Sequence, residues 1–148
     1  MKKFQILVGT VSGTALTVAE KIQQALTDAG HLCEINQEAE ETDLMRDPEE
    51  IFLICSATTG EGDLPTNILP LYIQLTNNFP AINHRQYGII GLGDSSYMNY
   101  NQAAQSLDAA FMDIGAIRTS EPLLLDALLT NTPADDALKW LPSWIRSL

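Results

Sequence analysis

Residues 6–20 read ILVGTVSGTALTVAE and join an apolar run to an amphipathic segment through a loop of small and hydroxylated residues. The apolar run ends at Gly9. After the loop, apolar residues recur every three or four positions, which is the spacing of one helix face. Gly30 closes this segment, in the position that glycine commonly takes after a last helical turn. The stretch therefore predicts a strand over 4–8, a loop, and a helix over 14–29.

The same alternation of short apolar runs and helical segments continues to the end of the chain. We expect strands at 4–8, 32–35, 51–56, 87–91 and 123–126. We expect helices at 14–29, 67–77, 101–114 and 134–147, the last with Trp140 and Trp144 on its core face. Parallel strands need crossover connections, and strands without polar alternation fit a sheet that is covered on both faces. The pattern predicts an α/β fold with a parallel sheet between helical layers, in one domain over residues 1–148.

The chain is strongly acidic, with 8 Lys and Arg against 19 Asp and Glu, and a net charge of −11. Such a charge disfavours binding to nucleic acid or to an anionic membrane surface and favours basic protein surfaces. Carboxylates are densest in residues 34–50, where Arg46 is the only basic residue. A run of this kind is either a solvated face that aids solubility or a patch where a partner docks.

The cysteines, the histidines and the hydropathy of the chain argue against a disulfide-linked, metal-binding, membrane-spanning or secreted protein. Cys33 and Cys55 lie in apolar runs without CxxC spacing, so we expect buried structural thiols. His31 and His84 lack ligand-like neighbours at short spacing, so we expect no metal site. No run approaches the length of a membrane span or a secretory signal. We expect a cytoplasmic protein without a membrane association.

The first loop, GTVSGTA at residues 9–15, has the composition of an anion site at the start of a helix. Gly9 and Gly13 permit unusual backbone angles, and free N–H groups with the positive end of the helix dipole face this loop. A Walker loop would need GK[ST] and a dinucleotide fingerprint would need GxGxxG, and neither is present. The alternative is an ordinary helix N-cap made by Ser12 or Thr14.

Two later loops follow the third and fourth expected strands and share this character. SATTGEGDLPTN at 56–67 combines hydroxyls with two glycines, and GLGDSSYMNYN at 91–101 adds two tyrosines. In a parallel sheet these loops meet the first one at the carboxyl edge, where open α/β sheets bind ligands. A tyrosine presented beside glycine-rich backbone offers a stacking surface for a planar heterocycle.

The three loops, in this order and spacing, resemble those of the flavodoxins and of the FMN domains of diflavin reductases. The resemblance covers essentially the whole chain and looks strongest to short-chain, YqcA- and MioC-type flavodoxins. It implies a flavodoxin-like three-layer αβα sandwich whose five-stranded parallel sheet has the order 2-1-3-4-5. The run after Arg118 lacks a long insertion, as in the short-chain class.

The resemblance also implies an FMN site built from the three loops. Its first part wraps the phosphate and comprises Thr10, Val11, Ser12, Gly13, Thr14 and Ala15. The second covers one face of the ring system and comprises Ala57, Thr58, Thr59, Gly60 and Glu61, where Gly60 matches the glycine whose peptide flips toward the flavin. The third meets the pyrimidine edge and the other face and comprises Leu92, Gly93, Asp94, Tyr97, Asn99, Tyr100 and Asn101.

One departure from the family pattern bears on affinity. Many flavodoxins have an aromatic residue where this chain has Thr59. Its absence removes about 0.5–1.5 kcal/mol of stacking beyond area burial. We therefore expect weaker FMN binding than in relatives with two flanking aromatic rings.

The resemblance implies a low-potential one-electron carrier. We expect no enzyme, because the sequence contains no pairing of a catalytic nucleophile with a base. The chain is too short to hold a reductase domain as well. We therefore expect a monomer that takes electrons from a flavodoxin/ferredoxin reductase and passes them to an acceptor redox enzyme, docking transiently through its acidic surface. One alternative is an FMN-dependent NAD(P)H/quinone oxidoreductase, although no insertion builds a substrate pocket. Another is a receiver-like module, which would need acidic residues after the first and third strands.

Overall fold

A central sheet runs through the molecule, and the computed structural model describes all of residues 1–148. The sheet order is β2-β1-β3-β4-β5, with β6 also paired to β4, and every pairing is parallel. The strands are β1 (Lys3–Gly9), β2 (Leu32–Asn36), β3 (Glu50–Ala57), β4 (Gln86–Gly93), β5 (Ile117–Arg118) and β6 (Leu123–Asp126). The predicted order 2-1-3-4-5 is confirmed.

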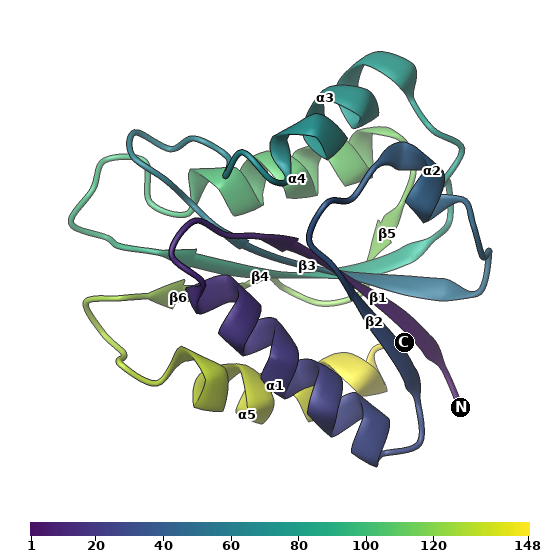
Figure 1. Cartoon of the computed structure of the whole chain (residues 1–148), viewed down its shortest axis with the longest axis horizontal. Coiled ribbons are helices and arrows are strands. Elements are labelled where there is room, and N and C mark those ends of the chain that lie inside the picture. The colour runs from purple at the N-terminus through teal and green to yellow at the C-terminus, as the bar shows by residue number, and fades with distance from the viewer.

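Helices cover both faces of this sheet (Figure 1). Helices α1 (Thr14–Asp28) and α5 (Pro133–Arg146) lie on one face, and α2 (Glu41–Leu44), α3 (Leu69–Asn78) and α4 (Gln102–Asp113) lie on the other. Successive side chains of a strand point to opposite faces. Ile6 accordingly packs in the core under α1 and α5, and Leu7 packs in the core under α3 and α4. The sheet is thus buried on both sides, as its uninterrupted apolar strands predict.

The sequence predicts one strand at the fifth position of the sheet, but the structure has two short strands there. This position is shared by β5, which pairs with the start of β4, and β6, which pairs with the end of β4. Residues 119–122 separate the two, and Pro122 among them has no N–H to donate to a ladder. The interruption is short, so no long insertion splits this edge of the sheet.

The acidic segment 34–50 is held largely by contacts within the protein. Lys3 pairs with Asp47 and Glu49, while Arg46 pairs with Glu34 and Glu50. Glu40 and Asp43 form the capping box of α2, a helix that the sequence did not predict. The segment is therefore a folded connection, although four of its eight carboxylates, those of Glu34, Glu38, Glu40 and Glu49, are exposed.

The last helix places the two tryptophans as expected. Trp144 is fully buried, and its ring lies 5.5 Å from that of Phe4. Trp140 is partly buried and stacks on Trp144, with ring centroids 5.5 Å apart and planes at 10°. A Cβ at Gly88 would lie 2.4 Å from the Trp144 indole nitrogen, so this strand position has no room for a side chain. The pair anchors α5 against the sheet.

Cys55 is a buried thiol as expected, whereas Cys33 is only partly buried. Cys55 is fully buried beneath α1, with its Sγ 3.5 Å from the carbonyl oxygen of Ala15. Burial raises the pKa of the Cys55 thiol to about 12 and, with the charge of Glu34, that of the partly buried Cys33 to about 12. Both thiols are therefore protonated and unreactive near neutral pH.

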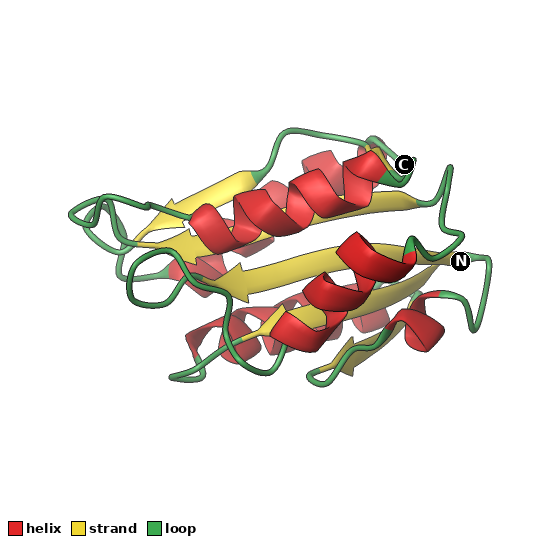
Figure 2. Cartoon of the chain, turned by 90° about the horizontal axis from the view of Figure 1, so that it is seen from above, coloured by secondary structure: helices red, strands yellow, loops and turns green.

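The loops that follow β1, β3, β4 and β6 gather at one edge of the sheet (Figure 2). They lie at the carboxyl ends of the strands, and the N-terminus lies at the opposite edge. None of the helices combines the length and apolar character needed to cross a bilayer.

Candidate functional site

Helix α1 begins without a side-chain cap. Its N-cap residue is Gly13, whose left-handed backbone (φ 96°) is one that glycine adopts without steric cost. No side chain accepts a hydrogen bond from the first turn, so the alternative that Ser12 or Thr14 caps the helix is wrong. The positive end of the helix dipole is thus open toward the loop that precedes it.

The loop before α1 presents a cluster of unpaired N–H groups. Thr10 donates its N–H to Asn67 Oδ1 at 2.9 Å, and Gly13 donates its N–H to Thr10 Oγ1 at 2.9 Å. The N–H groups of Val11, Ser12, Thr14, Ala15 and Leu16 donate to no acceptor within the protein. Unpaired donors at a helix start, the first four of them in or next to the loop, fit a phosphate group, which needs several N–H donors and no metal or lysine.

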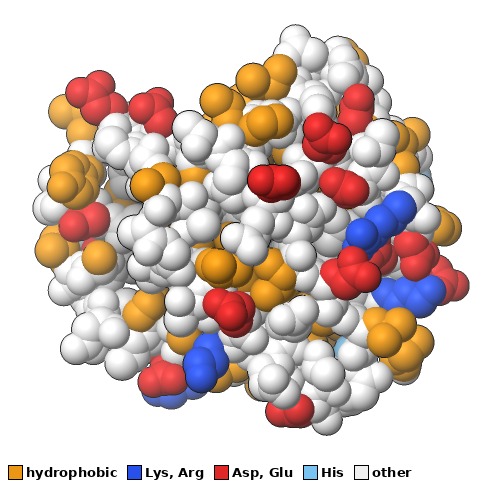
Figure 3. All heavy atoms as spheres, in the orientation of Figure 1, with side chains coloured by type: hydrophobic (Ala, Val, Ile, Leu, Met, Phe, Trp, Pro, Cys, Tyr) orange, Lys and Arg blue, Asp and Glu red, His pale blue; other side chains and the backbone are white.

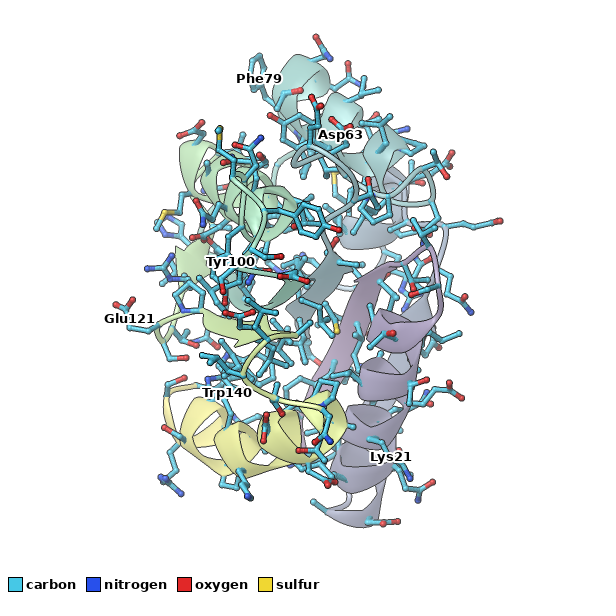
Figure 4. The ribbon with its side chains drawn as sticks, turned by 90° about the vertical axis from the view of Figure 1, so that its left-hand side faces the viewer. Lys21, Asp63, Phe79, Tyr100, Glu121 and Trp140 are labelled. Atoms are coloured by element: carbon cyan, nitrogen blue, oxygen red, sulfur yellow. The ribbon has the colours of Figure 1, made fainter.

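A pocket of about 560 Å³ opens beside this loop. Among its lining residues are twelve of those predicted for the site: Ser12, Thr14, Ala57, Thr58, Gly60, Leu92, Gly93, Asp94, Tyr97, Asn99, Tyr100 and Asn101. Figure 4 looks onto this edge of the sheet, with Asp63 and Tyr100 from two of the loops, while Lys21 lies away from them on α1. All three predicted loops therefore contribute to one concave surface.

Six predicted residues do not line the pocket. Thr10 and Gly13 are used in the hydrogen bonds that shape the first loop. Ala15 is fully buried, so it can offer the site only its backbone, and the exposed Val11 side chain does not line the pocket. Thr59 and Glu61 belong to the turn after β3 described below.

Tyr97 and Tyr100 differ in how they are held. The side chain of Tyr97 is 64% exposed at the pocket. Tyr100 is half-buried, and its hydroxyl lies 3.4 Å from the carbonyl oxygen of Leu124. An exposed ring on the wall of a pocket is free to stack on a planar ligand, so Tyr97 is the better placed of the two for that contact.

The turn after β3 is closed by its own hydrogen bonds. Thr59 and Asp63 exchange two backbone hydrogen bonds of 2.9 Å, and the Thr59 hydroxyl donates to the Asp63 carbonyl at 3.1 Å. Gly60 (φ 46°) and Gly62 (φ 102°) both have left-handed backbones, as their positions in the loop suggest. Asn99 donates to the carbonyl of Glu61 at 2.5 Å and so ties this turn to the loop after β4.

The side chain of Asn101 explains two of the glycines of β4. A Cβ at Gly91 would lie 2.7 Å from Asn101 Oδ1, and a Cβ at Gly93 would lie 3.0 Å from the same side chain. These glycines therefore make room for Asn101, and not simply for a ligand. Asn101 is fully buried, and its Oδ1 has no hydrogen-bond partner within the protein.

The end of β6, the loop that follows it and the start of α5 supply a wall of the pocket that the sequence did not indicate. Its residues are Leu125, Asp126, Ala127, Thr130 and Pro133. The buried carboxylate of Asp126 accepts hydrogen bonds from the N–H groups of Ser95 (3.1 Å) and Leu128 (3.0 Å). Hydrogen bonding to the Ser95 side chain, and after it to the N–H groups of Leu128 and Ser95, lowers the pKa of Asp126. The segment has no glycine motif, but its place at the end of the last strand was a usable signal.

Comparison with known proteins fits this geometry. The family described as flavodoxin matches residues 6–140. Flavodoxin YqcA of Escherichia coli (strain K12) is 34% identical over 144 residues, covering 97% of each chain. Protein MioC of the same strain is 32% identical over 148 residues, covering 100% of this chain and 99% of its own.

A solved structure gives the same result at the level of the fold. A cysteine-to-alanine mutant of flavodoxin from Pseudomonas aeruginosa superposes with a TM-score of 0.90 at 37% identity, covering 99% of this chain and 98% of that one. Sequence and structure thus agree over nearly the full length. The chain belongs to the flavodoxin family.

Proposed function

We propose that this protein binds FMN at the carboxyl edge of its sheet and acts as a low-potential one-electron carrier between a separate reductase and an acceptor protein. The observation that carries the proposal is the uncapped start of α1, with its unpaired N–H groups, beside a pocket walled by an exposed tyrosine. Membership in the flavodoxin family supports FMN as the ligand.

Each part of the site has a role in this proposal. The N–H groups of Val11, Ser12, Thr14 and Ala15 hold the phosphate, and Tyr97 stacks on the ring system. The turn at Thr59–Asp63 covers the other face with backbone and small side chains, so the affinity is lower than with two aromatic rings. Bound FMN supplies the redox chemistry, and the chain controls access and charge around it.

The charge distribution supports docking at the pocket edge. The loops at 9–14, 57–68, 93–101 and 126–133 contain no Lys or Arg, and their carboxylates are Glu61, Asp63, Asp94 and Asp126. On the face in Figure 3, the blue side chains lie at the right and below, and the charged side chains at the upper left are all acidic. A reductase or acceptor with a basic rim would be steered toward this edge, with an encounter that weakens as salt is added.

Titration with FMN tests the cofactor part of this proposal. The flavin absorbance should shift and its fluorescence should be quenched, and photoreduction of the complex should proceed in two resolved one-electron steps. A micromolar dissociation constant corresponds to a binding free energy of about −8 kcal/mol. Absence of FMN binding at micromolar concentrations would refute the proposal.

Reduction by partners tests the carrier part. A ferredoxin/flavodoxin reductase with NADPH should reduce the FMN-loaded protein, at a rate that falls with ionic strength. Glu61→Gln with Asp63→Asn should slow this reaction, whereas the control Asp113→Asn, at the far end of α4, should not. Steady NADPH consumption with a quinone and no added reductase would instead indicate an FMN-dependent oxidoreductase.

A further inference from the structure

Asn67 is the last residue of the second loop (56–67) and lies just before α3. It is not among the residues predicted to contact the ligand, yet its side chain holds the first loop. Its Oδ1 accepts the N–H of Thr10 at 2.9 Å, and its Nδ2 donates to the carbonyl of Val8 at 2.7 Å. The same Nδ2 donates to the carbonyl of Gln37 at 2.8 Å. One half-buried amide therefore joins the end of β1, the start of the α1 loop, and the connection after β2.

These bonds mimic the pairing of a neighbouring strand. Residues 8 and 10 present a carbonyl and an N–H on the same side of an extended chain, and the Asn67 amide satisfies both. The chain is thereby held extended beyond Gly9, the last residue of β1. Asn67 consequently helps to fix the point at which β1 leaves the sheet and the loop begins to turn.

A second hydrogen bond passes this constraint into the loop. Thr10 is fixed through its N–H by Asn67, and its Oγ1 accepts the N–H of Gly13 at 2.9 Å. Two of the N–H groups in the loop are thus used within the protein, and those of Val11, Ser12, Thr14 and Ala15 remain. Asn67 thus holds Thr10, and Thr10 holds Gly13. These two hydrogen bonds determine which N–H groups of the loop remain available to a ligand.

We propose that Asn67 is a positioning residue for phosphate recognition, acting through Thr10 and without touching the phosphate itself. This inference rests on the proposed function, because it concerns the same site. It predicts that Asn67 contributes to the binding of FMN but not to that of riboflavin, which has the ring system and no phosphate. A residue needed only for folding would affect both ligands alike.

The test compares dissociation constants for FMN and riboflavin in the full chain. Asn67→Ala should weaken FMN binding about tenfold, about 1.4 kcal/mol, and leave riboflavin binding nearly unchanged. The matched control is Asn77→Ala, since Asn77 is exposed on α3 and makes one hydrogen bond, to the carbonyl of Ile73 at 2.7 Å. It should alter neither constant. Equal losses for both ligands in Asn67→Ala, or no loss, would overturn the inference.

Thr10→Val provides a second variant that leaves Asn67 in place. It removes the acceptor for Gly13 and should also weaken FMN selectively. If the two residues act along one path, the double variant should lose less than the product of the two single losses. Independent, multiplicative losses would contradict the path through Thr10.

Inorganic phosphate tests the inference without the flavin. Titration of the wild-type protein should shift the amide NMR signals of Val11, Ser12, Thr14 and Ala15, and Asn67→Ala should reduce these shifts. If the wild type binds phosphate but not FMN, the proposed function fails while the role of Asn67 stands. Equal shifts in wild type and Asn67→Ala would refute that role.

Discussion

The carboxylate of Asp126, at the end of β6, accepts a hydrogen bond of 3.1 Å from the N–H of Ser95 in the loop after β4. The loop that carries Tyr97 is thereby attached to a strand that the chain forms about thirty residues later. Two walls of the pocket depend on one another through this contact. The charge state of Asp126 therefore affects the loop as well as the strand.

The first prediction concerns the pH dependence of this contact. The folded state lowers the pKa of Asp126, so its carboxylate stabilises the fold above the unfolded pKa, about 3.9. That stability is lost as the pH falls through the lower, folded pKa. Asp126→Ala should reduce the midpoint of thermal unfolding at pH 7, and its difference from wild type should shrink as the pH drops below about 4.

Glu20→Ala is the control for this experiment, because Glu20 is exposed on α1 and makes no ion pair. It should leave the midpoint close to that of wild type at every pH. A deficit in Asp126→Ala that stays constant down to pH 3 would show that the carboxylate charge is irrelevant.

The second prediction concerns the stacking surface. Tyr97→Ala should weaken FMN binding about tenfold, because the exposed ring loses its stacking and contact area. Tyr72→Ala is the comparison, since Tyr72 is a half-buried tyrosine of α3 that does not line the pocket. Fluorescence titration measures both. Equal effects of the two substitutions would mean that the loop after β4 is wrongly assigned.

The third prediction concerns the phosphate. Ser12→Asp places a carboxylate beside the unpaired N–H groups of the first loop, where it competes with and repels a dianion. FMN affinity should fall at least about tenfold, while riboflavin affinity should change little. Isothermal titration with the two ligands separates these outcomes, and an unchanged FMN affinity would argue against a phosphate at this loop.

The fourth prediction compares two glycines of one turn. Alanine at Gly60 or Gly62 adopts a left-handed backbone at a cost of about 1–2 kcal/mol. A Cβ at Gly60 has open space, with its nearest neighbour 3.9 Å away, whereas one at Gly62 would lie 2.7 Å from the Cβ of Asn99. Gly62→Ala should therefore destabilise the protein more than Gly60→Ala in urea unfolding. Matching losses would show that Asn99 moves aside without cost.

Much of the fold follows from hydrophobic periodicity. The apolar runs locate β1 through β4 and β6, and Gly30 takes the left-handed conformation expected after a helix. The division of the fifth position into β5 and β6 could not be read, because two residues of strand carry no periodicity. Helix α2 escaped prediction for the same reason, since its four residues lie in a charged connection.

The site was predictable only where its residues cluster in the sequence. Three glycine-rich loops identified most of the pocket, but Asn67 lies 57 residues from its partner Thr10, and Asp126 lies 31 from Ser95. Those pairings depend on which loops the sheet brings together. The glycines of β4 show the same limit, because the need for them comes from the buried side chain of Asn101.

The stacked pair in α5 gives the protein an internal optical probe. Trp140 and Trp144 are the only two tryptophans of the chain, and they lie together in the layer formed by α1 and α5. Intrinsic tryptophan emission will consequently report on that layer, while α3 and α4, which contain no tryptophan, do not contribute to it. A local opening of α5 can thus be distinguished from global unfolding by comparing emission with circular dichroism in the same sample.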